Sequence, residues 1–159
     1  MIVGVCFVNG APLSLTAGQQ NIGFYAYRNA NMTISPSFET LITYNTKTNE
    51  LPVGVFSTVT YRFTAPKDGR YSFTSAANLI TAAAGSGYLR LYKNGTRIGE
   101  QSDYGNAAMT LSLEYSAVIW LAKTDWVEMR IFQNTGFNAT LSGVGVQLCF
   151  SGAAIYAEG

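Results

Sequence analysis

Nine carboxylates are the side chains best suited to acid–base chemistry in this 159-residue chain, because it contains no histidine. The lack of histidine excludes Ser-His-Asp and Cys-His catalysis and histidine-ligated zinc. Glycoside hydrolysis would need two carboxylates at a set separation. The acids nearest to predicted loops and strands are Glu100, Asp103, Glu114, Asp125 and Glu128. Their spacing pairs none of them, so we expect solvated surface acids and no enzymatic activity.

Metal and sulfur chemistry have little support in the sequence. Asp103 could hold calcium together with backbone carbonyls, but one carboxylate is a small part of the roughly six to eight oxygens that calcium takes. We therefore expect no metal and no cofactor. The two cysteines, Cys6 and Cys149, are interpreted as buried thiols, with a single disulfide between them as the alternative.

The charge pattern limits the partners of the chain. Charged residues make up only 12% of the sequence, and the net charge of +1 comes from residues scattered singly. Nucleic acid is excluded as a partner because phosphate binding needs clustered Lys and Arg. A surface with so few charges favours a subunit interface, although a neutral Thr/Ser/Asn-rich monomer would have the same composition.

Residues 1–20 form a segment distinct from the domain predicted for residues 21–159. Their apolar run has no positive residue before it, which makes a poor signal peptide, and nothing in the chain approaches the roughly 20 apolar residues of a membrane span. As an exposed strand this run needs a cover. It either anchors the protein to a larger assembly or packs on its own domain. The anchor residues would be Ile2, Val3, Val5, Phe7 and Val8.

The remaining residue usage is that of an all-β protein, with ten Tyr, nine Phe and sixteen Gly and with short apolar runs between turn signals. Asn94-Gly95 lies between two short strands in residues 87–101, which predicts a type I′ hairpin turn. Residues 66–69, Pro-Lys-Asp-Gly, predict a second tight turn. Residues 110–115 alternate polar and apolar and run on to Leu121; after a break at residues 122–124 the chain returns as residues 125–132.

Three looser polar loops, at residues 81–86, 103–108 and 133–140, are the candidate recognition sites. Successive antiparallel strands place every second connection at the same end, so we expect these loops together at one end and the tight turns at the other. Aromatic rings beside amide and carboxylate groups suit the binding of sugars, although Gly, Asn and Ser are also ordinary turn formers. The candidate contact residues are Asp103, Tyr104, Asn106, Asn134, Phe137 and Asn138.

Several segments resemble one known family in order and spacing. They read GFYAYRNANMTI, ITYNT, YRFTAPKDGRYSFTS, LRLYKNGTRI, LSLEYSAVIWLAKTDWVEM and LCFSGAAIY. From about Ile22 to Tyr156 the chain is similar to the globular-head domain of the first complement component, which belongs with the tumour necrosis factor jelly rolls. The resemblance departs at Thr124-Asp125, where the family has Gly-Asp, and no Gly-X-Y collagen repeat precedes the domain.

The resemblance implies a ten-stranded jelly-roll β-sandwich and a compact homotrimer formed through the faces that bear the first and last strands. The aromatic residues among those expected at this interface could equally well belong to an ordinary core. The expected interface residues are Phe24, Tyr25, Tyr27, Tyr115, Trp120, Ala153, Ile155 and Tyr156.

Short domains of this kind occur in bacterial viruses as head decorations, head fibres or tail tips. We therefore expect a trimeric structural virion protein, assembled in the host cytoplasm and attached to the capsid or another virion protein by residues 1–20. The alternative is a tail or fibre module that binds cell-surface glycans through the three loops. A cellular bacterial binding protein of the same fold is the more distant alternative.

Overall fold

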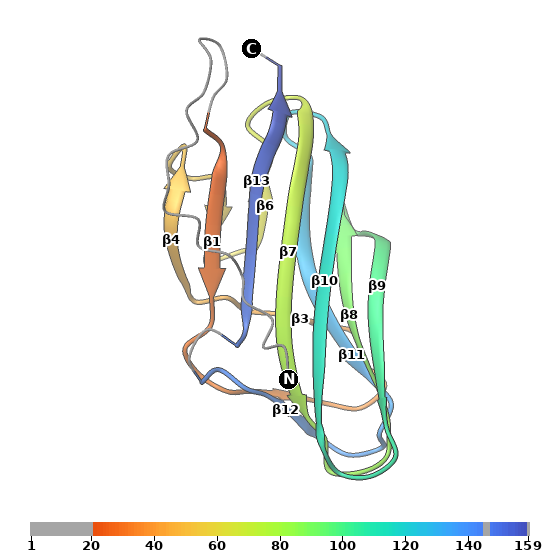
Figure 1. Ribbon diagram of the computed structural model, residues 1–159. Coiled ribbons are helices and arrows are strands. Elements are labelled where there is room, and N and C mark those ends of the chain that lie inside the picture. The colour runs from red at the N-terminus through yellow and green to blue at the C-terminus, as the bar shows by residue number, and fades with distance from the viewer. Residues whose placement is uncertain (1–20, 145–146, 159) are drawn as a thin grey trace.

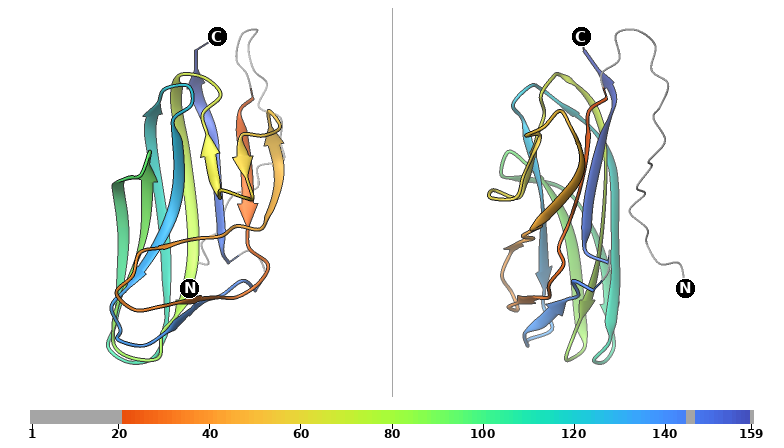
Figure 2. Two further views of the ribbon diagram at one scale, coloured as in Figure 1. Left: turned by 180° about the vertical axis from the view of Figure 1, so that it is seen from behind. Right: turned by 90° about the vertical axis from the view of Figure 1, so that its left-hand side faces the viewer.

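The computed structural model describes residues 21–144 and 147–158, and within them the chain folds as two antiparallel β-sheets packed face to face (Figure 1). Figure 2 shows the two layers edge-on in its right-hand view. No described residue lies in a helix. The prediction of an all-β jelly-roll sandwich is confirmed.

The first sheet, here called sheet A, has its two longest strands, β7 and β10, paired side by side at one edge. Its strands are β1 (Gly23–Tyr27), β2 (Met32–Ile34), β4 (Thr46–Leu51), β7 (Gly69–Ile80), β10 (Thr110–Leu121), β12 (Ala139–Leu141) and β13 (Cys149–Ala157). Across the sheet the order is β10, β7, β13, β1, β4, with β12 and then β2 extending the sheet beside one end of β7.

The second sheet, sheet B, is built around β11. Its strands are β3 (Thr40–Leu41), β5 (Phe56–Ser57), β6 (Arg62–Thr64), β8 (Gly85–Lys93), β9 (Thr96–Gly105) and β11 (Trp126–Gln133). The order is β5, β6, β11, β8, β9, and β3 also pairs with β11.

The core between the sheets is rich in aromatic rings. The Phe24 ring stacks on Phe56 at 4.9 Å and on Phe63 at 5.1 Å and meets Phe150 edge-on at 5.0 Å. Gly152 lies opposite Phe24 in the β1–β13 pair, and a side chain there would collide with the Phe73 ring. The small residue in the last strand therefore makes room for the core of its own chain.

The strands differ in number from the ten expected, because the described residues form thirteen. Several of the additional pairings are only two or three residues long, too short to show a hydrophobic period in sequence. The predicted first strand also breaks after Tyr27 and resumes at Met32, with Arg28 bonded through its side chain to the Thr43 carbonyl.

The turns lie where the sequence predicts them. Asn94 and Gly95 have φ values of 49° and 82°, as a type I′ turn requires. The tight turns meet at one end, where the Lys123 amide donates to the Asp68 carboxylate and the Glu158 amide donates to the Asp68 carbonyl. β1 begins and β13 ends at this end of the sandwich (Figure 1), which we call the proximal end.

The turn between β10 and β11 accommodates the departure from the family pattern. Thr124 takes the left-handed conformation, with φ at 76°, that a glycine would occupy more easily. The Asp125 carboxylate holds the turn: it accepts from the Ala122 amide at 2.9 Å and from the Asn94 side chain at 2.7 Å, and it pairs with Lys93 at 2.8 Å.

Replacing Thr124 by glycine should stabilise the protein. The left-handed conformation costs an L-residue about 1–2 kcal/mol, and glycine avoids this cost. Glycine also makes the unfolded chain more flexible, which lowers the free energy of unfolding, so we expect a net gain of about 0.5–1 kcal/mol. The melting temperature should rise by about 2–3 °C. Thr96→Gly, at a strand position without positive φ, is the control and should lower it. Equal losses in both variants would contradict the strained turn.

Acid should weaken the same turn. Hydrogen bonds from Lys93 and Asn94 lower the pKa of Asp125 from 3.8 to about 2. A lowered folded-state pKa adds stability above pH 3.8 that is lost as the pH falls through 2. Asp125→Asn should therefore cost about 1 kcal/mol above pH 4.5, and this cost should shrink towards pH 2. Urea unfolding across pH 2–6 measures it, and a cost that stays constant with pH would refute the carboxylate's role.

Candidate functional site

The outer face of sheet A carries almost no charge. The four strands β1, β7, β10 and β13 contain only two charged residues, Arg70 and Glu114. Arg70 lies between Trp120 on one neighbouring strand and Tyr156 on the other. Four large apolar side chains of these two neighbouring strands are about half exposed: Val118, Trp120, Ile155 and Tyr156, at 48–57%. The proximal half of this face is therefore an exposed apolar surface with one cation in it.

The outer face of sheet B differs sharply, because it carries a network of ion pairs. Arg90 lies between Glu39 and Glu100, and Arg97 also contacts Glu100. Burial alone would lower the pKa of Arg90, but its bonds to the two glutamates raise it overall. Arg90 also lies over the rings of Tyr88 and Phe132, at 4.9 and 4.7 Å from their centres.

The deepest carboxylate of this network is Glu128. Its side chain is fully buried and forms ion pairs with Arg62 at 2.6 Å and Arg130 at 2.5 Å. The two guanidinium groups in turn stack on aromatic rings, Arg62 over Trp126 at 3.6 Å and Arg130 over Tyr92 at 4.3 Å. Each charged group on this part of the face thus contacts a group of opposite charge, which lets the face contact water without further cover.

The expected interface residues fall into two groups. Phe24 belongs to the core rather than to an interface, because it is stacked inside its own sandwich. Tyr115 also points inwards, with its hydroxyl against Gly99 of β9. The others lie on the outer face of sheet A, because strand residues alternate between faces and a bulge between Ala154 and Tyr156 leaves the adjacent residues Ile155 and Tyr156 both exposed. They are Tyr25, Tyr27, Trp120, Ala153, Ile155 and Tyr156.

Within this outer-face group the degree of burial varies. Tyr25 is only 6% exposed and forms a small second buried cluster with Ala76 and Cys149, against which Tyr27 packs. Cys149 is disulfide-bonded, so the expectation of a thiol at this position is wrong. Cys6 and the proposed anchor residues 2–8 lie outside the described residues.

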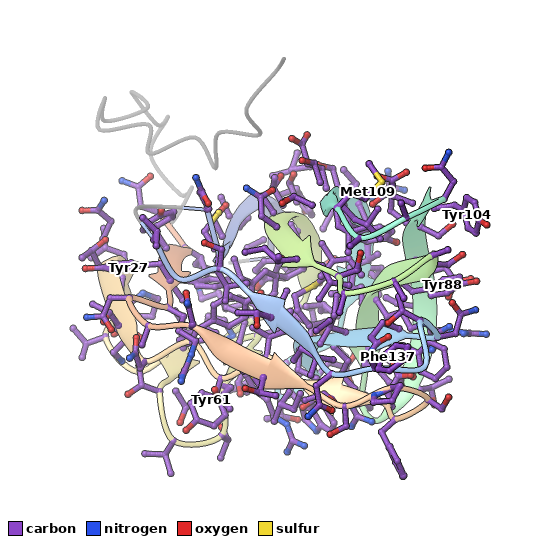
Figure 3. The ribbon with its side chains drawn as sticks, turned by 90° about the horizontal axis from the view of Figure 1, so that it is seen from below. Tyr27, Tyr61, Tyr88, Tyr104, Met109 and Phe137 are labelled. Carbon is purple, nitrogen blue, oxygen red and sulfur yellow. The ribbon has the colours of Figure 1, made fainter. Side chains whose placement is uncertain are left out.

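The three predicted loops meet at one end of the sandwich, opposite the tight turns, which we call the distal end. The Ser86 amide donates to the Asn134 side chain at 2.7 Å, and the Asn134 amide returns a bond to the Ser86 carbonyl. The Thr81 amide and hydroxyl both donate hydrogen bonds to the Met109 carbonyl, and the Met109 amide donates to the Thr81 hydroxyl. Figure 3 views this end, with Met109, Tyr104 and Phe137 along one side of it.

The candidate ligand residues differ in what they offer at this end. Tyr104 is 64% and Phe137 62% exposed, and Asn106 and Asn138 are also exposed. Asn134 instead holds two loops together, as described above, and the Asp103 carboxylate accepts a bond from the Tyr104 amide. The surface-facing groups are thus two aromatic rings and two amides.

Two residues of the distal end were not identified from the sequence. Phe38 is 67% exposed in a loop that the Ser37 amide joins to the Gln133 carbonyl. Gln133 is fully buried and bonds to the carbonyls of Ile34 and Phe137 and to Thr135. The Ser-Pro-Ser turn signal before Phe38 marks a loop, whereas nothing local marks Gln133 as its organiser.

Three of the candidate catalytic carboxylates are engaged in ion pairs: Glu100, Asp125 and Glu128. Among residues 21–144 and 147–158 no cluster of three or more Asp, Glu, Cys or His side chains could hold a metal ion. The same part of the chain has no helix long and apolar enough to cross a membrane.

The sheet order and the aromatic core define a jelly-roll sandwich of the kind found in complement globular heads and tumour necrosis factors. Residues 23–155 match the C1q domain family, and the chain belongs to it. Domains of this class are often trimeric binding modules and are typically not enzymes.

Three solved structures illustrate the likeness in fold. The globular domain of the zebrafish complement 1qA protein is 20% identical, with a TM-score of 0.62 over 87% of this chain and all of that one. The Eiger tumour necrosis factor of S. frugiperda is 10% identical, with a TM-score of 0.65 over 89% and 96% of the two chains. Murine APRIL is 11% identical, with a TM-score of 0.67 over 86% and 100%. No curated protein matches the sequence.

Proposed function

We propose that this chain works as a homotrimeric, non-enzymatic module whose copies meet through the outer face of sheet A. The observation that carries the proposal is the difference between the two outer faces. Sheet B presents matched ion pairs, whereas four strands of sheet A carry only Arg70 and Glu114. Apolar surface without charge is typical of the buried part of homo-oligomer interfaces.

A three-fold assembly also accounts for the free strand edges. β10 ends sheet A and β9 ends sheet B, and both are long strands on the same side of the sandwich (Figure 1). Such edges invite uncontrolled pairing unless they are covered. A closed ring of three copies covers apolar faces and edges and cannot grow further.

Hydroxyl-radical footprinting tests which face is buried. Trp120, Ile155 and Tyr156 are about half exposed in the single chain, and Tyr104 and Phe137 are somewhat more exposed. In the assembled protein we expect the first three to be protected and the last two to react freely. Equal labelling of both groups would contradict the proposed face.

For the biological setting, we propose a structural virion protein, such as a phage capsid decoration or head fibre, assembled in the host cytoplasm. The support is the resemblance to short virion domains of this fold and the apolar run of residues 2–8, which precedes the family match at residue 23. Deleting residues 2–8 should release the protein from purified particles. Unchanged incorporation would refute attachment by this segment.

A second candidate function is host recognition at a tail or fibre tip. It is favoured by Tyr104 and Phe137, which expose aromatic rings at the distal end. Their replacement by alanine should reduce adsorption of the virus to host cells. Adsorption at the wild-type rate would exclude this role.

A further inference from the structure

We infer that the distal end is a preformed binding rim for an uncharged glycan. The rim is defined by Phe38, Tyr104, Asn106, Phe137 and Asn138. The inference deepens the recognition function proposed above, because it names the class of ligand. It does not depend on where in a virion the protein is placed.

The loop that carries Phe137 is held in place by hydrogen bonds to a buried polar side chain, that of Gln133. The Gln133 side chain donates to the Ile34 carbonyl at 3.1 Å and to the Phe137 carbonyl at 2.8 Å. Its carbonyl oxygen accepts from the Thr135 amide at 2.8 Å and the Thr135 hydroxyl at 2.7 Å. All four hydrogen-bonding positions of this buried amide are filled, so the loop that carries Phe137 has a fixed position.

The other side of the rim is fixed as firmly. Tyr104 lies at the end of β9, paired with Ser86, and the Asp103 carboxylate accepts from its amide at 2.8 Å. The Asn134 side chain then joins Ser86 to the loop that carries Phe137. Tyr104 and Phe137 therefore stand on two loops that are tied together. A rigid site loses little entropy when it binds.

The exposed groups match the surface of a sugar ring. A pyranose has an apolar C–H face that packs on aromatic rings and hydroxyls that need hydrogen-bond partners. Tyr104, Phe137 and Phe38 supply rings at 62–67% exposure. The side-chain amides of Asn106 and Asn138 make no hydrogen bond within the described residues and can donate and accept.

The charges of the rim decide between classes of glycan. The three loops contain one charged residue, Asp103, and no Lys or Arg. Arg90 of β8, on the outer face of sheet B, is already held between Glu39 and Glu100. A sialylated, uronic or sulfated glycan would thus meet a carboxylate and no available cation. The rim fits an uncharged glycan.

The experiment is affinity electrophoresis of the intact protein in gels that contain one polysaccharide each. The uncharged probes are dextran, mannan and galactan, and the anionic probes are alginate and heparin. We expect at least one uncharged probe to retard the protein and neither anionic probe to do so. Retardation by the anionic probes alone, or by none of the five, would overturn the inference.

Variants locate the binding on the rim. Tyr104→Ala and Phe137→Ala should each weaken retardation by about tenfold or more, as loss of a central aromatic contact does. Phe137→Tyr keeps the ring and should bind within about twofold of wild type. Val53→Ala, at an 88% exposed site at the proximal end, is the matched control. Equal binding by all four variants would place the site elsewhere and refute the rim.

The outcomes also separate this inference from the function on which it rests. If adsorption to host cells needs Tyr104 and Phe137 but no uncharged probe is bound, recognition holds and the ligand class is wrong. If a probe is bound at the rim but adsorption is unchanged, the ligand class holds and the recognition role fails.

Discussion

Trp120→Arg should break the proposed trimer into monomers without unfolding the chain. Trp120 is 48% exposed in the single chain and lies beside Arg70 on the neighbouring strand. A surface substitution of this kind changes the stability of the chain by no more than about 0.5 kcal/mol. Within the proposed interface, however, a second unpaired cation next to Arg70 would be buried, which costs several kcal/mol. We expect the mass to fall to that of one chain, 17.2 kDa.

A matched variant controls for the effect of adding any arginine. Val59→Arg changes a side chain that is 83% exposed between β5 and β6, away from the outer face of sheet A. It should leave the trimer intact. Val118→Arg, on the same face as Trp120, should dissociate it. Trimers in all three variants would show that the copies meet elsewhere.

Phe24→Ala should cause the largest loss of stability of a single chain. The ring touches four other aromatic residues of the core, Phe56, Phe63, Phe73 and Phe150. Truncation of a buried phenylalanine costs about 3–5 kcal/mol, and for a chain of this length this lowers the melting temperature by about 6–20 °C. Calorimetry at a fixed protein concentration measures the shift.

The same truncation at an exposed ring is the control for Phe24→Ala. Phe137 is 62% exposed at the distal end, so Phe137→Ala should change the melting temperature by no more than a degree or two. Comparable losses in the two variants would contradict the assignment of Phe24 to the core.

Most of the fold could be predicted because its signals are local. Asn94-Gly95 specifies its own turn through positive φ values, and the alternation in residues 110–121 appears as one continuous strand. The convergence of the three loops follows from antiparallel order alone. The sequence marked Thr124 as a departure from the glycine of the family, and this residue takes the left-handed conformation in the structure.

The residues of the proposed interface were harder to assign from sequence because both faces of sheet A are apolar. In β1, Phe24 and Ala26 face the core while Tyr25 and Tyr27 face outwards, and hydrophobicity does not distinguish the two sets. One error was avoidable. Tyr115 and Trp120 are five residues apart in one strand, so they must lie on opposite faces.

The ion pairs of sheet B could not be foreseen, because they join residues far apart in sequence. Arg62 and Glu128 are separated by 66 positions, and Arg90 and Glu39 by 51. Gln133 is similar: it organises the distal loops through bonds to Ile34, 99 positions away, as well as to its neighbours. Such contacts depend on the register of the sheets, which no local pattern specifies.

The most direct test of the account is the molar mass of the intact protein by size-exclusion chromatography with light scattering. Three chains of 17.2 kDa have a mass of 51.6 kDa, and we expect one species of that mass which persists on dilution. A species of 17.2 kDa at all concentrations would contradict the central claim, because the apolar outer face of sheet A would then not be covered by other copies of the chain.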